Sequence, residues 1–146
     1  MRRAIAAVFA VATLVLPSSD AWATATAKAT PKKKVVTASK SFTGAAGSAG
    51  RWGDVQITIV VKKTTTTNLA TKKKTVKRKI TSVKVPVYPD HTDRSVFINQ
   101  QALPYLIQET IQAQSTGIDM VSGATDTSMA FQQSLQSAIL KAKAWK

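Results

Sequence analysis

The sequence predicts a small α+β domain in which an antiparallel sheet packs against two helices. Residues 55–61 and 79–87 alternate apolar and polar side chains, with the period of two that indicates a strand with one wet face. Residues 98–114 and 126–144 repeat apolar side chains with the period of an amphipathic helix. Because the strands precede the helices instead of alternating with them, the two kinds of element are expected to form separate layers around one core.

The strands are expected to begin near Val35. Residues 35–42 contain several β-branched side chains and are predicted to form the first strand, and the small, Gly-rich segment 43–50 is predicted to be a loop. Pro86 indicates an edge strand or a strand end, since proline cannot donate a ladder hydrogen bond. In the strand at 79–87, the alternation places Ile80 outward and one row of valines toward the core: Val83, Val85 and Val87.

The connection between the two clear strands, residues 62–78, consists largely of Thr and Lys. We interpret it as an extended hairpin tip that contributes little to the core and whose side chains keep the strand edges soluble. Residues 88–95, which contain the single histidine His91, are predicted to be a solvated loop.

The first helix is predicted to begin at Ile98, with Asn99 as its N-cap and Pro104 near the first turn, where proline is tolerated. Gly117 is predicted to be its C-cap. The second helix carries Asp126 in its first turn and lysines in its last turns, and these charges suit the helix dipole. Its buried stripe is predicted to consist of Ser128, Phe131, Leu135, Ala138, Ile139 and Ala142.

The N-terminal residues have the pattern of a secretory signal peptide. A basic start precedes an uncharged apolar run, Ala4–Leu16, and a small-x-small cleavage pattern ends at Ala23. We expect residues 1–23 to be a cleaved signal peptide; the alternative is an uncleaved N-terminal anchor. Residues 24–34 are expected to be a disordered linker before the folded domain at 35–146. The protein is therefore expected to be exported and extracytoplasmic, either secreted or associated with the cell envelope.

Composition excludes several kinds of chemistry. The chain has no cysteine, so disulfides, thiolate metal sites and thiol redox chemistry are excluded. The single histidine argues against a histidine-based metal site. The seven acidic residues show no acid–base pair at a suggestive spacing, so no stand-alone catalytic site is predicted. The formal net charge is +14 at pH 7.

The most informative segment is Asp119-Met120-Val121-Ser122-Gly123-Ala124-Thr125, which leads directly into the second predicted helix. Gly123 permits the sharp turn that brings the hydroxyl of Thr125 to the start of that helix. Unpaired backbone amides and the positive end of the helix dipole meet there and favour a bound phosphate. Ser122, Gly123 and Ala124 are all small, so that a bulky group can approach Thr125.

The run D-x-x-S-G-A-T resembles the flavinylation motif of the FMN-binding domain family, which includes the C subunit of the sodium-translocating NADH:quinone reductase and the G subunit of the Rnf electron-transport complex. The resemblance covers roughly residues 51–142 and is strongest over 99–140. It implies FMN as the cofactor, joined to Thr125 by a phosphoester and attached by a flavin transferase. It also implies that the transferase reads Asp119, with the Mg²⁺ that such a transfer requires.

The motif residues also suit a structural role. Thr125 or Thr127 fits the N-cap of a helix, with Asp126 or Ser128 close behind. In the flavin interpretation, Thr127 and Ser128 add hydroxyl or amide hydrogen bonds to the phosphate. FMN held without a covalent bond is a further alternative.

The isoalloxazine ring of FMN needs an apolar or aromatic wall. For every candidate residue, packing in the core is the alternative role. The stronger candidates are Leu103, Pro104, Tyr105 and Leu106, and the weaker ones are Trp52, Tyr88 and Phe131.

Two functions from different classes follow. The first is an exported electron carrier with bound FMN, whose partners are a flavin transferase and a redox partner in the membrane or outside the cytoplasm. The second is a basic extracytoplasmic binding module that uses Lys62–Lys79 to contact anionic membrane or wall polymers; a merely solvated hairpin is its alternative. No nucleic-acid partner is expected, because no aromatic side chain lies among these lysines.

Overall fold

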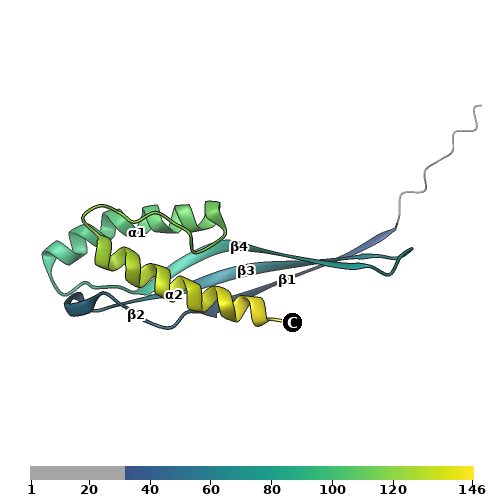
Figure 1. The fold of residues 1–146 in the computed structure, drawn as a ribbon, viewed down its shortest axis with the longest axis horizontal. Coiled ribbons are helices and arrows are strands. Elements are labelled where there is room, and N and C mark those ends of the chain that lie inside the picture. The colour runs from purple at the N-terminus through teal and green to yellow at the C-terminus, as the bar shows by residue number, and fades with distance from the viewer. Residues whose placement is uncertain (1–31) are drawn as a thin grey trace, which may run out of the picture. The chain divides into compact units, whose positions relative to one another are not determined.

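The computed structural model describes residues 32–146; the predicted signal segment 1–23 and residues 24–31 of the predicted linker lie outside the described residues. The described part of the chain is an antiparallel sheet covered by two helices, which confirms the predicted α+β class (Figure 1). In chain order the elements are β1 (Lys33–Thr43), β2 (Gly47–Ser48), a 3-10 helix (Gly50–Trp52), β3 (Asp54–Asn68), β4 (Lys74–Val87), α1 (Asp93–Ala113) and α2 (Thr125–Ala144).

The central strand of the sheet is β3. It pairs antiparallel with β1 on one side and with β4 on the other, so that Phe42, Ile59 and Val83 lie side by side. After β1 has ended, β2 resumes the pairing with β3 inside the segment that the sequence predicted to be a loop. Among the described strands, β4 pairs with β3 alone. Pro86 lies in β4, so the predicted edge position of this proline is confirmed.

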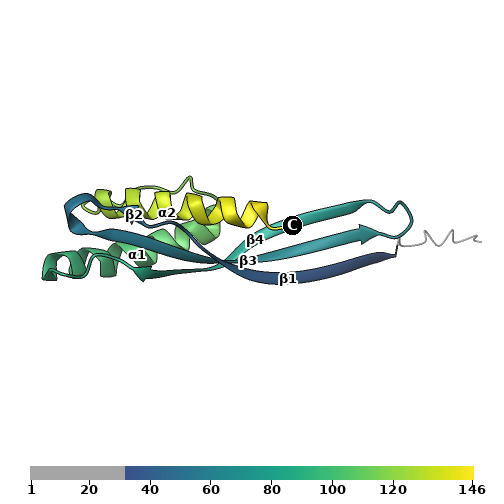
Figure 2. The same ribbon diagram turned by 90° about the horizontal axis from the view of Figure 1, so that it is seen from below.

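The core lies between one face of the sheet and the two helices (Figures 1 and 2). Phe131 and Leu135 of α2 and Leu106 of α1 have no exposed surface there. The buried stripe predicted for α2 is confirmed except at Ile139, which is partly buried against the core. Within residues 32–146, neither helix offers a stretch apolar enough to cross a membrane. The sheet contributes alternate residues of β3 to the core: Val55, Ile57, Ile59 and Val61.

Two β-bulges in β4 change which of its side chains face the core. The register with β3 shifts at two places, and β4 has one extra residue at each. An extra residue reverses the alternation of inward and outward side chains. Ile80 is therefore buried together with Val83, whereas Val87 is 45% exposed. The sequence-based placement of Ile80 and Val87 is wrong, because a strict period of two does not allow for bulges.

The helix α1 begins at Asp93, five residues before the predicted start. Its N-cap is Thr92, whose hydroxyl accepts a hydrogen bond from the backbone amide of Ser95 over 3.1 Å. The predicted N-cap, Asn99, is a buried residue inside the helix, and Pro104 lies in the helix interior instead of the first turn. Both predictions are wrong because the first turn of α1 is polar and was assigned to the preceding loop.

Gln114 ends α1 and connects it to the sheet. It has a left-handed φ of 54°. Its side-chain oxygen accepts from the amide of Ile80 over 2.7 Å, and its side-chain nitrogen donates to the carbonyl of Ile80 over 2.9 Å. These bonds satisfy backbone groups of β4 beside its first bulge. The C-cap position predicted for Gly117 is wrong, since the chain has already left the helix there.

The helix α2 lies very close to the sheet because two glycines allow it. A Cβ at Gly44 would overlap the backbone carbonyl of Ser134, and a Cβ at Gly47 would overlap that of Ala130. At the same place the buried hydroxyl of Ser134 accepts a hydrogen bond from the amide of Ile57 over 2.9 Å. This contact sets the position of α2, and with it the position of the motif at its start.

The three long strands continue past the helices as a narrow arm (Figure 2). We define the arm as Lys32–Lys40 together with Lys62–Lys79. β3 and β4 pair as far as Thr67 opposite Lys74, so the predicted hairpin is confirmed. β1 pairs with β3 as far as Lys33 opposite Asn68. The first strand begins two residues before its predicted start, inside the predicted linker. The arm contributes little to the core, as the sequence indicated: every β1 residue before Phe42 is exposed.

Candidate functional site

The segment 114–124 joins the two helices and ends in a tight turn. The amide of Ala124 donates to the carbonyl of Val121 over 2.9 Å, and Gly123 has a φ of 80°, a conformation that favours glycine. The hydroxyl of Ser128 donates to Ala124 O over 2.9 Å and accepts from the amide of Val121 over 3.1 Å. Because Ser128 is fully buried, its role in the structure is to hold the shape of this turn.

The helix α2 begins without a side-chain cap. Its N-cap residue is Ala124, and its first backbone bond runs from the amide of Ser128 to Ala124 O over 2.9 Å. The amides of Thr125, Asp126 and Thr127 therefore have no partner within the helix. The N-cap role considered for Thr125 or Thr127 is wrong. Free amides and the positive end of the helix dipole instead form a surface that attracts anions.

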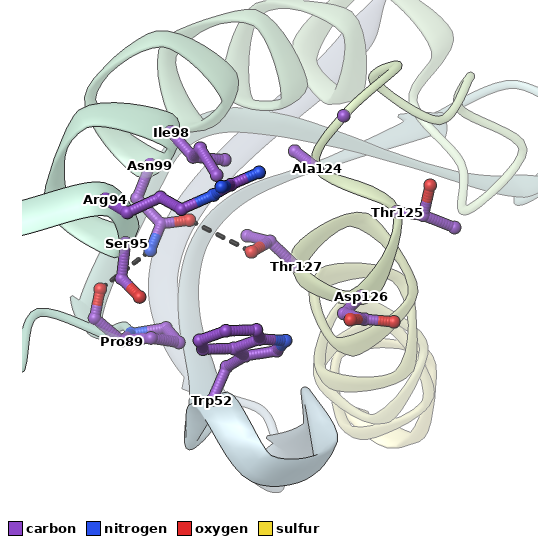
Figure 3. A pocket seen from close by; sticks show the side chains of 11 residues that line it. Trp52, Pro89, Arg94, Ser95, Ile98, Asn99, Ala124, Thr125, Asp126 and Thr127 are labelled. Atoms are coloured by element: carbon purple, nitrogen blue, oxygen red, sulfur yellow. Dashed lines mark hydrogen bonds between the residues drawn. The ribbon is translucent and has the colours of Figure 1, made fainter. Parts of the chain in front are cut away.

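A buried chain of hydrogen bonds connects the start of α2 to α1 (Figure 3). The hydroxyl of Thr127 donates to Asn99 Oδ1 over 3.0 Å, and Asn99 Nδ2 donates to the Pro89 carbonyl over 2.7 Å. Asn99 is 1% exposed and Thr127 is 7% exposed. Each of these groups would cost about 1–3 kcal/mol if it were buried without a partner. The chain therefore holds the two helix ends and the loop before α1 in one arrangement.

Asn99 and Thr127 are expected to be energetically coupled. Asn99→Leu leaves the Thr127 hydroxyl and the Pro89 carbonyl unpaired, so the free energy of unfolding should fall by about 2–3 kcal/mol. Thr127→Val should cost about 1–2 kcal/mol for the same reason. In urea denaturation, the double variant is expected to lose less than the sum of the two single variants. Strictly additive losses would show that the two side chains do not support each other.

Beside this chain of hydrogen bonds lies a cavity of about 220 Å³. Its walls come from the 3-10 helix, the loop before α1, the first turns of α1 and the start of α2 (Figure 3). These segments are far apart in the sequence and meet only in the folded domain. The lining residues are Trp52, Pro89, Arg94, Ser95, Ile98, Asn99 and residues 123–127.

Trp52 and Arg94 give the cavity an aromatic wall and a positive charge. In Figure 3 the Trp52 ring borders the cavity from below, and the Arg94 side chain extends from α1 toward Ala124. The guanidinium of Arg51 stacks on Trp52, with Cζ 4.7 Å from the ring centroid. An aromatic surface beside cationic groups suits a flat ligand that carries negative charge.

Thr125 is exposed at the first position of α2 and lies at the rim of the cavity. Figure 3 shows its side chain on the outer side of the turn, directed away from the Asn99–Thr127 pair. A second macromolecule can therefore reach the hydroxyl of Thr125 from solvent. A group joined to this oxygen would start at the cavity rim, beside the free amides of the first helical turn.

The structure divides the residues that the sequence singled out into two sets. Four of them line the cavity: Gly123, Ala124, Thr125 and Thr127. Three do not: Asp119, Ser122 and Ser128. Asp119 is exposed, and its backbone amide donates to Glu109 Oε1 over 3.0 Å, which fastens the segment before the turn to α1.

Of the proposed ring-wall residues, only Trp52 lines the cavity. Three of the others pack in the hydrophobic core, as the alternative role for these residues predicted: Leu103, Leu106 and Phe131. The remaining three are exposed and lie outside the cavity lining: Tyr88, Pro104 and Tyr105.

Sequence reasoning missed six lining residues: Pro89, Arg94, Ser95, Ile98, Asn99 and Asp126. It placed the first three in a solvated loop and gave the other three only roles in forming the helices. The spacing Thr92-x-x-Ser95 before an apolar pattern was the available signal for the true helix start.

The family of the chain follows from comparison of sequences. The sequence model of the FMN-binding domain family matches residues 50–140, which is more than half of the chain. The chain therefore belongs to the FMN-binding domain family. It is an FMN-binding flavoprotein domain, and FMN is the cofactor that this family domain indicates. The matched range contains every residue that lines the cavity. Comparison with curated protein sequences gives no match.

The residues around the cavity fit part of an FMN molecule. The free amides of the first turn of α2 and the Arg94 guanidinium suit a phosphate group, and Trp52 offers a flat surface to a ring. The cavity is smaller than the roughly 300 Å³ at which pockets enclose a whole ligand, so part of the cofactor would lie at the surface. When bound, FMN would supply redox chemistry, and the residues around the cavity would bind, orient and partly shield it.

Proposed function

We propose that FMN is joined to Oγ1 of Thr125 through a phosphoester and that the protein is an electron carrier outside the cytoplasmic membrane. The observation that carries this proposal is the position of Thr125. Thr125 is the last residue of the D-x-x-S-G-A-T run; it is exposed and lies at the rim of the cavity. It is also the first residue of α2, a helix whose start has no side-chain cap. The helix end offsets the remaining negative charge of the phosphodiester by about 0.3–1 kcal/mol.

Attachment requires a flavin transferase and an activated flavin. The Thr125 hydroxyl attacks the flavin-side phosphorus of a flavin dinucleotide, so that an Oγ1–P bond forms while the pyrophosphate P–O bond breaks. A nucleoside monophosphate leaves, and the hydroxyl proton passes to a base of the transferase. Asp119 is exposed ahead of the turn and is recognised by the transferase together with Mg²⁺. Neither electrons nor an oxidant are needed in this step.

Partial exposure of the cofactor suits electron transfer. A ring that stands partly outside the cavity can approach a redox partner in the membrane or outside the cytoplasm without unfolding of the site. A covalent bond also keeps the flavin on the protein in a compartment that does not resupply it. Export itself rests on the predicted signal segment 1–23.

The flavin content of the protein tests this proposal. The chain is produced with its signal segment, with and without a co-expressed flavin transferase. With the transferase, we expect an intact mass increased by one FMN less one water and a fluorescent band after denaturing electrophoresis. We also expect the visible absorbance to bleach reversibly on reduction with dithionite, as an electron carrier requires.

The possible outcomes separate the parts of the proposal. A colourless denatured band from protein that holds FMN through native dialysis would contradict the covalent bond and identify a non-covalent flavoprotein. Flavin that cannot be reduced and reoxidised would contradict electron transfer. Signal-bearing protein that stays in the cytoplasmic fraction would contradict export.

A further inference from the structure

The arm carries a large positive charge without compensating acidic residues. Its segments Lys32–Lys40 and Lys62–Lys79 contain twelve Lys and Arg side chains and no Asp or Glu. Strand pairing concentrates these charges, since Lys62 lies close to Lys79 across the sheet as its Cα partner. Like charges opposite each other on neighbouring strands destabilise a sheet. The arrangement therefore costs folding free energy that a bound anion would recover.

Protection of sheet edges accounts for only part of this charge. Lysines on edge strands discourage pairing with other sheets. Lys62, however, lies on the central strand β3, between Ser39 of β1 and Lys79 of β4. The neighbouring Lys63 has a structural contact, because its ammonium lies 4.4 Å from the ring centroid of Trp145. Successive side chains of a strand point to opposite faces, so Lys62 lies on the face away from that contact.

The face that carries Lys62 also has a groove near the tip of the arm. The groove encloses about 370 Å³ and is lined by Lys33, Lys73 and Lys77, with three threonines and one asparagine between them. Ammonium groups bind phosphate as point charges, and hydroxyl and amide groups donate hydrogen bonds to phosphate oxygens. Lys77 and Lys79 alternate with Arg78 along β4, so they share one face and extend the row of charge from the groove toward Lys62.

A row of cations along a narrow sheet matches a linear polymer better than a membrane surface. The opposite face of the arm is also charged, since Lys34 and Lys74 occupy one rung of the sheet there. A flat bilayer meets one face at a time, whereas a flexible chain can follow both. Anchoring at a bilayer interface uses aromatic side chains together with one continuous apolar face. The arm contains no Trp, Tyr or Phe. Its exposed large apolar side chains are divided between the two faces and the turn: Val35, Val36, Leu69 and Val76.

We propose that the arm binds a linear phosphate polymer along the face that carries Lys62, Lys77 and Lys79. Repeating phosphates occupy the groove at the tip and then follow the row of lysines, and the release of counterions drives the association. This interaction is independent of the flavin. It would hold the FMN-binding domain at a polymer rich in phosphate while leaving the cavity, which is lined by other elements, free for a redox partner.

The test compares two triple variants of the full chain with the same change in net charge. The arm variant carries Lys62→Gln, Lys77→Gln and Lys79→Gln. The control variant carries Lys84→Gln, Lys143→Gln and Lys146→Gln, three exposed positions outside the arm. Binding to long-chain inorganic polyphosphate is measured by titration calorimetry over a series of salt concentrations, and circular dichroism verifies that each variant is folded.

For the wild-type chain, the logarithm of the binding constant should fall linearly with the logarithm of the salt concentration. The arm variant should bind at least about tenfold more weakly, with a slope smaller in magnitude by about 2, since each lost phosphate contact removes about 0.7. The control variant should lose less than about threefold. If the triple arm variant does not fold, Lys62→Gln alone should still lose about threefold.

Three results would overturn the proposal. One is an equal loss of affinity in the arm and control variants, which would mean that net charge alone matters. Another is salt-independent binding. The third is binding to phosphatidylglycerol vesicles as tight as binding to polyphosphate at equal accessible phosphate, which would assign the arm to a membrane surface instead.

Discussion

Thr125→Ala is expected to abolish covalent flavin attachment while leaving the fold intact. The substitution removes the only atom of the proposed phosphoester that the chain supplies. Since Thr125 is exposed and α2 has no side-chain cap, the free energy of unfolding should change by less than about 0.5 kcal/mol. Protein co-expressed with a flavin transferase is analysed by denaturing electrophoresis with in-gel fluorescence, by intact mass and by urea denaturation.

Two further variants make this result specific. Thr125→Ser retains a hydroxyl at the same position and should recover part of the covalent flavin. Thr71→Ala changes an exposed threonine in the turn of the arm and should be flavinylated like the wild type. A fluorescent denatured band that persists in Thr125→Ala would mean that another residue carries the flavin, and the proposed attachment site would be abandoned.

Gly44→Ala is expected to have the largest effect on stability. The added Cβ would overlap the backbone carbonyl of Ser134, and a backbone group cannot rotate away as a side chain can. Either α2 must move off the sheet or the segment after β1 must be displaced. We expect the free energy of unfolding to fall by about 3 kcal/mol, the upper end of the usual cost of overpacking. Urea denaturation followed by circular dichroism measures the loss.

The same displacement should reach the cofactor site. α2 carries Thr125 and Thr127 at its start, so a shift of this helix alters one wall of the cavity. FMN retention during native dialysis should decrease in Gly44→Ala. The matched control is Gly117→Ala, because a Cβ there meets only Ser115 Oγ at an ordinary 3.6 Å; its stability should change by less than about 0.5 kcal/mol. If Gly44→Ala loses no more free energy of unfolding than this control, the close contact between Gly44 and the Ser134 carbonyl does not exist.

Local sequence patterns predicted the structure correctly where the geometry of a single helix or strand determines which side chains are buried. The buried stripe of α2 follows from the helical period and from its helix-forming residues, and the structure has this helix within one residue of its predicted start. The alternation in 55–61 likewise predicted the buried row of β3. In both cases the side chains that face the core are set by the geometry of one regular element.

Local sequence patterns predicted the wrong burial or the wrong role where contacts between two elements determine them. The bulges in β4 arise from its pairing with β3, and they turn Ile80 inward and Val87 outward against the alternation. Asn99 looked like a helix cap because a short polar side chain is common at caps. In the folded domain it is instead the buried partner of Thr127 and of the Pro89 carbonyl, two groups distant from it in the sequence.

The amino-acid sequence by itself determined the order of the elements, the amphipathic face of α2 and the D-x-x-S-G-A-T run that indicates the family. These are properties of contiguous residues. Tertiary structure alone decided the remainder of the candidate site: Trp52, Arg94 and Asn99 meet the motif only because the close contact of α2 with the sheet and the early start of α1 bring their ends together. A cavity is enclosed by segments distant along the chain, so its lining depends on packing that no local pattern contains.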